Sequence, residues 1–341
     1  MNIGIIGASG YAGGELIRLL QNHPEFNIEY LAAHSQAGEK VIFAHPHLTD
    51  YCDQVFSEIS VEKLNELDLL FFSLPHGTSA SLIKQVNPDK FIVDIGADFR
   101  LANPLSWKKY YGTEYAGKWV YGLVDLPGQI DKIKHTKQVA NPGCYATAIE
   151  LSAAPLVSNN LINQTDITVV AASGTTGAGR AVKSNLLAAE STNSLSSYKF
   201  GGVHQHTPEI EETLTSINNQ NTKISFTPIL APMPRGILST LSATLNKKID
   251  ISALRELILK FYENSSDVKL LPEGMMPQTN SVLGSNHVLL QVAIDEHTNR
   301  VLVSAAIDNL TKGAAGQAIQ NANLISGFPI NLGLNQIGLG R

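Results

Sequence analysis

The first 142 residues alternate short apolar runs with segments whose apolar side chains recur at helical spacing. Runs of strand length occupy residues 2–6, 28–33, 67–74 and 91–95. A helix is predicted over residues 14–22, because its three leucines can lie on one helix face. Strands that alternate with helices are typical of a doubly wound parallel sheet, so a Rossmann-type α/β fold is predicted here.

The pattern changes after residue 142. The predicted strands lie farther apart along the chain, and several alternate apolar with polar positions. They are residues 169–172, 223–227, 240–245, 288–294 and 301–306. This spacing predicts a second, α+β domain with a mixed or antiparallel sheet. A last helix is expected over residues 314–326, and the polar stretch 191–197 is predicted to be a loop.

Composition and charge narrow the functional classes. A length of 341 residues suits about two domains. Hydrophobic residues make up 43% of the chain and charged residues 16%, which argues against intrinsic disorder. With a net charge of −5 and no basic tract, the chain lacks the clustered cations that nucleic-acid binding requires. Neither a membrane-spanning apolar run nor a signal peptide is recognisable, so the cytoplasm is the expected location.

Three glycines stand between the first predicted strand and the first helix. Glycines let the backbone approach a pyrophosphate, and the free amides of a helix N-terminus can hold it. Such a turn can also serve packing alone, but its place after the first strand favours a dinucleotide. The predicted cofactor residues in this turn are Gly7, Ser9, Gly10, Tyr11, Ala12 and Gly13.

The end of the second predicted strand bears on which dinucleotide binds. An acid at this place would hold the ribose 2′-hydroxyl of NAD. No acid follows the strand directly here. Ser35, with His34 and Lys40 nearby, could accept a 2′-phosphate instead. NADP is therefore the predicted cofactor, and the alternative is that these residues form only a polar loop.

Cys144 is the candidate nucleophile. It follows the tight turn Asn141-Pro142-Gly143 and opens an almost wholly apolar helix that runs to about residue 157. A helix N-terminus favours the thiolate, which can attack an acyl carbon and form a thioester that accepts a hydride. A free cysteine can equally be a core residue. The second cysteine, Cys52, is predicted to be structural, and two cysteines without a CxxC pair make neither a disulfide framework nor a cysteine metal site.

Two histidines, His204 and His206, could supply the acid and base that a thiol nucleophile needs. In an extended segment they would share one face. A metal pair is an alternative, but no third ligand lies nearby in the sequence, so no metal is predicted. A structural, hydrogen-bonded role is the other alternative.

Three arginines stand in glycine- or proline-rich surroundings that suit anion binding. They are Arg100, Arg180 and Arg235, and Ser173 opens the glycine-rich segment before Arg180. A guanidinium binds carboxylate or phosphate through two parallel hydrogen bonds, so the three arginines are predicted to hold the substrate. Ser173 is predicted to contact the substrate with them. The alternative for each arginine is a buried ion pair that fixes a loop. Asp94 and Asp98 are the evident partners of Arg100.

Taken together, these segments resemble the N-acetyl-γ-glutamyl-phosphate reductase family in its longer form. The match runs through almost the whole chain. It comprises residues 7–13, 74–77, 96–101, 121–123, 141–145, 204–210, 234–236 and 308–317. The resemblance implies NADPH-dependent reduction of an acyl phosphate to an aldehyde in arginine biosynthesis, with release of inorganic phosphate by a homo-oligomer, either dimer or tetramer.

The resemblance also implies roles for individual residues. Cys144 is the nucleophile and His206 the acid/base, with His204 as the alternative. Three residues would approach the nicotinamide: Asn309, Lys312 and Gly313. The implied NADP-binding domain is residues 1–142 plus 312–341, and the implied catalytic and oligomerisation domain is residues 143–311. The family often has arginine where this chain has Gln205 and His34, which leaves one substrate contact and the NADP preference less well supported.

Other functions remain open on the sequence. A related dehydrogenase could act on aspartyl phosphate or on a carrier-linked aminoadipyl substrate. A regulator that binds NADPH without chemistry would not need Cys144 and the two histidines. A cysteine hydrolase would leave the N-terminal glycine turn without a purpose.

Overall fold

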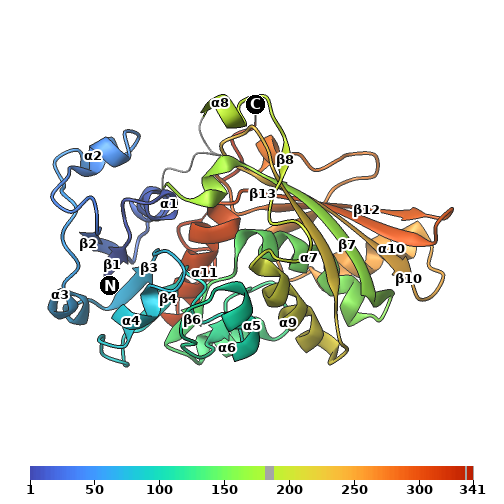
Figure 1. Cartoon of the computed structure of the whole chain (residues 1–341), viewed down its shortest axis with the longest axis horizontal. Coiled ribbons are helices and arrows are strands. Elements are labelled where there is room, and N and C mark those ends of the chain that lie inside the picture. Colours follow the sequence, from blue (N-terminus) through green and yellow to red (C-terminus); the bar gives the residue numbers. More distant parts are fainter. Residues whose placement is uncertain (181–187, 335, 341) are drawn as a thin grey trace. The chain divides into compact units, whose positions relative to one another are not determined.

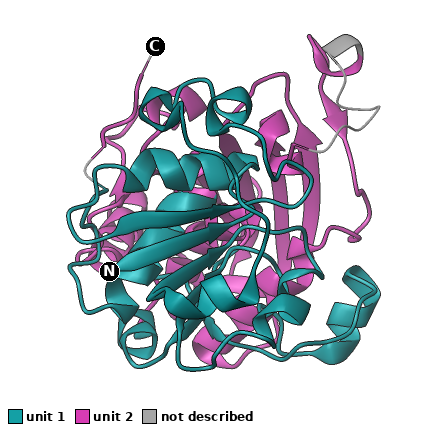
Figure 2. Ribbon diagram, turned by 90° about the vertical axis from the view of Figure 1, so that its left-hand side faces the viewer, with its two compact units in different colours: residues 1–124, 128–142, 314–335 teal, residues 125–127, 143–313, 336–341 magenta. Residues whose placement is uncertain are grey.

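The computed structural model of the chain describes residues 1–180, 188–334 and 336–340. It divides into a first unit of Met1–Val124, Gly128–Pro142 and Ala314–Asn335 and a second unit of Asp125–Pro127, Gly143–Gly313 and Gln336–Arg341 (Figure 2). These units differ from the predicted domains at three places. Residues 125–127, 312–313 and 336–341 belong to the second unit, because contacts within that unit hold them.

The first unit is built on a six-stranded parallel sheet, which confirms the predicted Rossmann-type fold. Its strand order is β2-β1-β3-β4-β6-β5 (Figure 1). The strands are β1 (Asn2–Ile6), β2 (Asn27–Ala32), β3 (Leu69–Phe72), β4 (Phe91–Asp94), β5 (Val120–Tyr121) and β6 (Gln138–Ala140). The order changes direction between β1 and β3, and parallel sheets bind ligands at the carboxyl ends of strands beside such a switch point.

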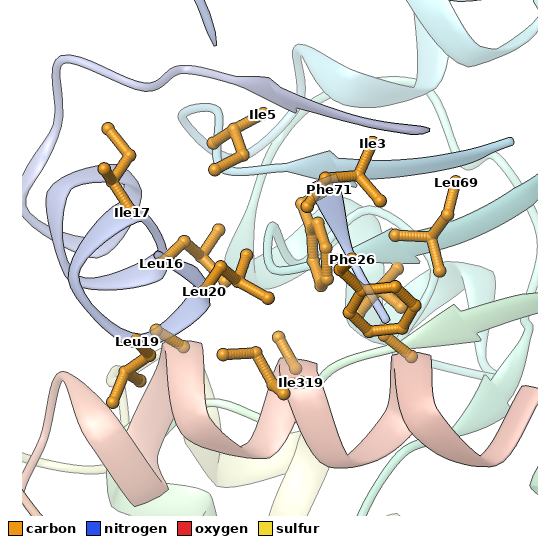
Figure 3. Packing of buried hydrophobic residues seen from close by; sticks show 14 of the residues in the cluster. Ile3, Ile5, Leu16, Ile17, Leu19, Leu20, Phe26, Leu69, Phe71 and Ile319 are labelled. Carbon is orange, nitrogen blue, oxygen red and sulfur yellow. The ribbon is translucent and has the colours of Figure 1, made fainter. Parts of the chain in front are cut away.

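Two apolar layers enclose this sheet, because neighbouring residues of a strand point to opposite faces. Ile3 and Ile5 of β1 belong to one layer and Ile6 to the other. The first layer includes residues of α1 (Tyr11–Leu20), α6 (Gln129–Lys134) and α11 (Gly316–Ile325); Figure 3 shows its leucines and Ile319 together. The second layer includes residues of α3 (Val61–Glu66) and α4 (Ser79–Ile83). The remaining helical segments are α2 (Val41–Ala44), η1 (Thr49–Tyr51) and α5 (Pro104–Tyr110).

Helix α11 is tied to the first unit by amide side chains. Asn321 Nδ2 donates to Asn141 Oδ1 over 3.0 Å, and Asn141 Nδ2 donates to the Ala314 carbonyl over 3.2 Å. Both asparagines are fully buried, so these hydrogen bonds satisfy groups that would otherwise cost free energy. These hydrogen bonds attach the segment that begins at Ala314 to the first unit.

The second unit contains a seven-stranded mixed sheet, as predicted, in the order β11-β12-β13-β10-β7-β9-β8. Its strands are β7 (Ile162–Ser173), β8 (Ser196–Ser197), β9 (Ile224–Leu230), β10 (Ile237–Leu245), β11 (Val268–Leu270), β12 (Val288–Asp295) and β13 (Arg300–Ile307). Burial alternates along β7 and β10, so one sheet face is packed and the other is more exposed. The packed face lies against α7 (Cys144–Ser158). The other helical segments that the structure describes here are α8 (Ala188–Ser191), α9 (His206–Asn218), α10 (Ile251–Phe261), η2 (Thr175–Ala178), η4 (Thr279–Ser281) and η5 (Thr311–Ala315).

Two local predictions are wrong. The first helix begins at Tyr11, whereas the prediction placed its start at residue 14. The prediction was late because glycines, which have low helix propensity, occupy the first turn. The stretch 191–197, predicted as a loop, ends in β8, which pairs with β9 through main-chain atoms. Serine side chains carry no apolar signal of such an edge strand. Among the described residues, no helix is long and apolar enough to span a membrane.

Candidate active site

The glycine turn after β1 has the geometry of a pyrophosphate cradle. A side-chain carbon on Gly13 would lie 2.7 Å from the Ala8 Cα, and one on Gly7 would overlap the Ser73 carbonyl. The positive φ of Gly7, 85°, also favours glycine. The Gly7 and Ala8 amides both donate to the Ala32 carbonyl over 2.9 Å. The amides in the first turn of α1 have no acceptor within the helix, as at every helix start, so this backbone can receive an anion.

Ser35 lies in the exposed turn that follows β2, at the same edge of the sheet as the glycine turn. His34 is exposed beside it, and no carboxylate directly follows the strand. Lys40, farther along, forms an exposed ion pair with Asp53 at 3.4 Å. The position suits recognition of a ribose 2′-substituent.

Two buried carboxylates hold the loop that follows β3. Asp98 accepts hydrogen bonds from the Gly77 amide at 2.7 Å and the Ala80 amide at 3.1 Å. Asp94 accepts from the Gly96 amide at 3.0 Å and the Ser79 hydroxyl at 3.1 Å. Sequence reasoning considered these aspartates only as ion-pair partners of an arginine. They instead fix the loop between β3 and α4.

Arg100 is held by main-chain carbonyls. Its Nε donates to the Asn141 carbonyl over 2.7 Å and its Nη2 donates to the Ile95 carbonyl over 2.8 Å. Only 4% of the residue is exposed. The guanidinium therefore braces main-chain segments through carbonyl oxygens, and these bonds differ from the ion pair that was the alternative to substrate binding.

Burial, together with the neighbouring Asp98 charge, raises the pKa of Asp94 to about 7. The native protein then keeps a proton between about pH 4 and pH 7 that the unfolded chain has lost, so stability falls as pH rises through this window and levels off above it. The free energy of unfolding should fall by about 2–4 kcal/mol over this window, because each unit of pKa shift corresponds to about 1.4 kcal/mol. We expect Asp94→Asn to flatten this dependence in urea unfolding at pH 5 to 8.

The control for that experiment is Asp131→Asn, which changes an exposed carboxylate. It should keep the wild-type slope. A wild-type free energy of unfolding that rises between pH 5 and pH 7 relative to Asp94→Asn would contradict the assignment.

Cys144 is the first residue of α7, as predicted. Gly143 precedes it in an extended conformation, and nearly every residue of the helix is buried. The main chain of Gly313 packs directly on the nucleophile, since a side-chain carbon there would lie 2.8 Å from the Cys144 Cβ. Gly313 therefore has to be glycine so that the backbone can lie against Cys144.

The two histidines do not share a face of an extended segment, which corrects that expectation. His206 is the first residue of α9, and His204 lies just before the helix. The His206 amide donates to His204 Nδ1 over 3.1 Å, so a neutral His204 carries its proton on Nε2. Both residues are buried, and their ring centroids are 4.9 Å apart.

Two tyrosines that sequence reasoning missed complete this cluster. The Tyr198 hydroxyl donates to the Tyr145 hydroxyl over 3.1 Å, and both rings lie edge-on to His204. Burial raises the pKa of each tyrosine, and the charge of the Cys144 thiolate contributes to both increases. Both hydroxyls therefore stay protonated at neutral pH. The only sequence signal was that Tyr145 directly follows the nucleophile.

Glu209 ties the histidine helix to the nucleophile helix. Its Oε1 accepts the Gly143 amide over 2.7 Å, and the residue is 2% exposed. It lies in the first turn of α9, three residues after His206, while Gly143 directly precedes Cys144. This bond couples the positions of the two catalytic candidates.

Arg235 and Asn309 fix loops beside the carboxyl end of β7. Arg235 Nη2 lies 2.9 Å from Asp308 Oδ2 and donates to the Thr311 hydroxyl over 3.0 Å. Asn309 Oδ1 accepts the Gly236 amide over 2.7 Å, and its Nδ2 donates to the Thr176 hydroxyl over 3.1 Å. These contacts fix the two loops, and the substrate role of Arg235 and the cofactor role of Asn309 stay predictions.

Ser173 and Arg180 lie on the same stretch of chain. Ser173 ends β7 and is 2% exposed; its hydroxyl donates to the Gly174 carbonyl over 3.1 Å and lies close enough to the Tyr145 hydroxyl to interact with it. Arg180 follows η2 and is half-buried. The structure therefore brings Ser173 to the tyrosine cluster.

Lys312 is a buried anchor. Its residue surface is fully buried, and its Nζ lies 2.6 Å from Asp125 Oδ2 and 3.9 Å from Asp267 Oδ2. The Ser265 hydroxyl donates to the other Asp125 oxygen over 2.6 Å. Lys312 belongs to the π-helical turn η5 (Thr311–Ala315). The ammonium group is therefore held by buried carboxylates, and a contact of Lys312 with the cofactor stays a prediction. Within the described part of the chain, no group of three or more histidine, cysteine or acidic side chains could hold a metal ion.

Comparison with known proteins shows the relationship. A family profile described as the NAD-binding domain of semialdehyde dehydrogenases matches residues 2–135, and one described as their dimerisation domain matches residues 144–309. An N-acetyl-gamma-glutamyl-phosphate reductase of Acidothermus cellulolyticus is 50% identical over 337 residues, covering 99% of this chain and 98% of that protein. The chain belongs to the N-acetyl-gamma-glutamyl-phosphate reductase family. The resemblance seen in the sequence is thereby confirmed.

Other relatives agree. The N-acetyl-gamma-glutamyl-phosphate reductase of Salinispora arenicola is 47% identical, covering 99% of each chain. Among solved structures, aspartate semialdehyde dehydrogenase with NADP from Candida albicans has a TM-score of 0.70 at 18% identity and covers 95% of this chain and 98% of its own. The aspartate semialdehyde dehydrogenase II of Vibrio cholerae complexed with ASA has a TM-score of 0.69 at 17% identity, covering 96% and 98%. At these identities the structures establish the fold alone.

Proposed function

We infer that the chain reduces N-acetyl-γ-glutamyl phosphate to N-acetylglutamate 5-semialdehyde with NADPH, a step of arginine biosynthesis. The 50% identity to a reductase of that name over nearly the whole chain carries this inference. The placement of Cys144 at the start of a buried helix supplies the chemistry it needs. The dimerisation-domain match supports a homo-oligomer, for which we propose a dimer or tetramer, in the cytoplasm.

Cys144 is assigned the nucleophilic role. The helix N-terminus stabilises its thiolate, and the first-turn amides of α7 can stabilise the oxyanion that forms when the thiolate attacks the γ-carbonyl. Inorganic phosphate then leaves and a thioester remains on Cys144. When bound, NADPH supplies the hydride that reduces the thioester carbon. The adduct collapses to the aldehyde and the free thiol.

His206 is assigned the proton transfers. It takes the thiol proton during attack and returns it to the departing phosphate. It then takes a proton from solvent and gives it to the sulfur as the adduct collapses to the aldehyde and the thiol. His204 is assigned a positioning role, because its Nδ1 already accepts the His206 amide at the start of α9. Glu209 supports this arrangement by joining the first turn of α9 to the residue before Cys144.

The cofactor is assigned to the first unit. The main chain of residues 7–13 would hold the pyrophosphate. The turn is tight enough that a side-chain carbon at Gly7 or Gly13 would overlap neighbouring backbone atoms, and helix N-termini bind such anions. Ser35 would hold the 2′-phosphate that distinguishes NADP, with no acid in place to prefer NAD. Ser173 and Arg180 are the proposed substrate contacts, and the main chain of Gly313 keeps Cys144 in position.

Measurement of the reverse reaction tests this function. We expect N-acetylglutamate semialdehyde, inorganic phosphate and NADP together to give rising absorbance at the reduced-nicotinamide band. NAD in place of NADP should give much slower turnover, as should aspartate semialdehyde in place of the acetylated substrate. Turnover that does not require phosphate, or a preference for aspartate semialdehyde, would overturn the proposal.

A further inference from the structure

The chain makes a long excursion between β2 and β3 in the first unit. Residues 38–41 pair with residues 54–56 on the return: the Gly38 amide donates to the Phe56 carbonyl over 2.8 Å, and the Val41 amide donates to the Gln54 carbonyl over 2.9 Å. Helix α2 lies within this excursion, as Figure 1 shows, and His45 caps its end. Ser35 lies at the beginning of the same excursion.

The His45 ring lies between the glycine turn and the first turn of α1. Only 2% of the residue is exposed. Its Nε2 lies 2.9 Å from the Ala8 carbonyl oxygen and donates to it. A side-chain carbon on Gly14 would lie 2.5 Å from His45 Nδ1, so Gly14 leaves the space that the ring fills. Phe56, from the returning strand of the excursion, packs edge-on against the ring with centroids 6.2 Å apart.

Three other carbonyl oxygens at this turn already accept main-chain amides. Ala32 O accepts the Gly7 and Ala8 amides, Gly7 O accepts the Gly10 amide over 3.1 Å, and Gly10 O accepts the Gly14 amide over 2.9 Å. The Ala8 carbonyl oxygen is not among these main-chain acceptors, and it accepts its hydrogen bond from the His45 side chain. A carbonyl turned outward would present negative charge to a pyrophosphate, whereas an inward carbonyl leaves the amides facing the anion.

We propose that His45 is a positioning residue for the dinucleotide: it holds the Ala8 carbonyl inward and so keeps the glycine turn in its anion-binding conformation. This rests on the proposed function only in taking NADPH as the ligand. Both the neutral Nε2–H form and the imidazolium donate, so the bond forms in either protonation state. The ring also anchors the excursion that carries Ser35, which places the proposed 2′-phosphate contact and the pyrophosphate turn on one braced element.

The test compares His45→Ala, His45→Gln and the control His47→Ala, which removes an exposed ring two residues away. NADPH dissociation constants are measured by the fluorescence of the reduced nicotinamide, without turnover. We expect His45→Ala to weaken NADPH binding about tenfold, the scale of one lost hydrogen bond. His45→Gln, whose amide can still donate, should recover most of the affinity. The KM for the semialdehyde and kcat at saturating cofactor should stay near wild type.

A merely structural role gives a different result. His45→Ala would then lower the melting temperature and the active fraction while the surviving protein bound NADPH with wild-type affinity, which would overturn the proposal. Equal weakening in His45→Gln and His45→Ala would also overturn it, because the donor would not matter. Absence of semialdehyde turnover in a wild-type protein that binds NADPH would refute the proposed reaction and leave this inference standing. Absence of NADPH binding in the wild type would refute both.

Discussion

Cys144→Ser should abolish turnover, with a loss of kcat of about a thousandfold or more. Serine nearly preserves the volume of the side chain at the start of α7, so the helix and its packing against Gly313 remain. The helix N-terminus favours a thiolate, whose pKa starts near 8.5, but cannot ionise an unassisted hydroxyl at neutral pH. The reverse reaction, followed by nicotinamide absorbance, measures the loss.

The chain offers a matched control in Cys52, which is exposed and was predicted to be structural. Cys52→Ser should keep wild-type kcat. NADPH affinity should be the same in both variants, because the proposed cofactor residues are untouched. Turnover of Cys144→Ser within a factor of a few of the wild type would remove Cys144 from the mechanism.

Lys312→Met should destabilise the protein by about 3–5 kcal/mol. Methionine fills a similar volume but leaves Asp125 and Asp267 buried without the ammonium group that lies 2.6 Å and 3.9 Å from them. Uncompensated burial of a carboxylate is among the costliest consequences of a single substitution. Activity should fall as well, because the neighbouring Gly313 lies against Cys144. Urea unfolding measures the stability change.

Lys137→Met is the control, since its ion pair with Asp89 has the similar distance of 2.7 Å but is exposed. That substitution should cost less than about 1 kcal/mol. The double variant Lys312→Met with Asp125→Leu should regain part of the stability, because it also removes a buried charge. If Lys312 contacts the cofactor instead, Lys312→Met would keep wild-type stability and raise only the KM for NADPH.

The main strands of the first unit could be predicted from the sequence because each is marked by the residues within it. Apolar runs of strand length mark β1, β2, β3 and β4, and buried parallel strands need apolar residues on both faces. The short strands β5, β6, β8 and β11 were missed. Strands of two or three residues are too short for a period to emerge, and edge pairing uses main-chain atoms that the side chains do not reveal.

The site residues likewise fall into those that local sequence identified and those that depend on distant partners. The turn before Cys144 and the glycine turn after β1 are features of adjacent residues, and the structure has both. The histidines were identified but their geometry was not, because the start of α9 at His206 was not recognised. Tyr198 and Glu209 were missed. Each acquires its role from a partner more than fifty residues away, Tyr145 in one case and Gly143 in the other.

The sequence by itself determined the fold class, the place of the nucleophile and the family, since strand periodicity, helix starts and motif spacing depend on neighbouring residues. Only the tertiary structure decided which partners the charged residues have. Arg100, Arg235 and Lys312 all stand in motif segments, yet they hold Asn141, Asp308 and Asp125, from 41 to 187 positions away. Whether a charged side chain stabilises a loop or contacts a ligand depends on the groups that the fold places next to it. The residues adjacent in the sequence do not reveal those groups.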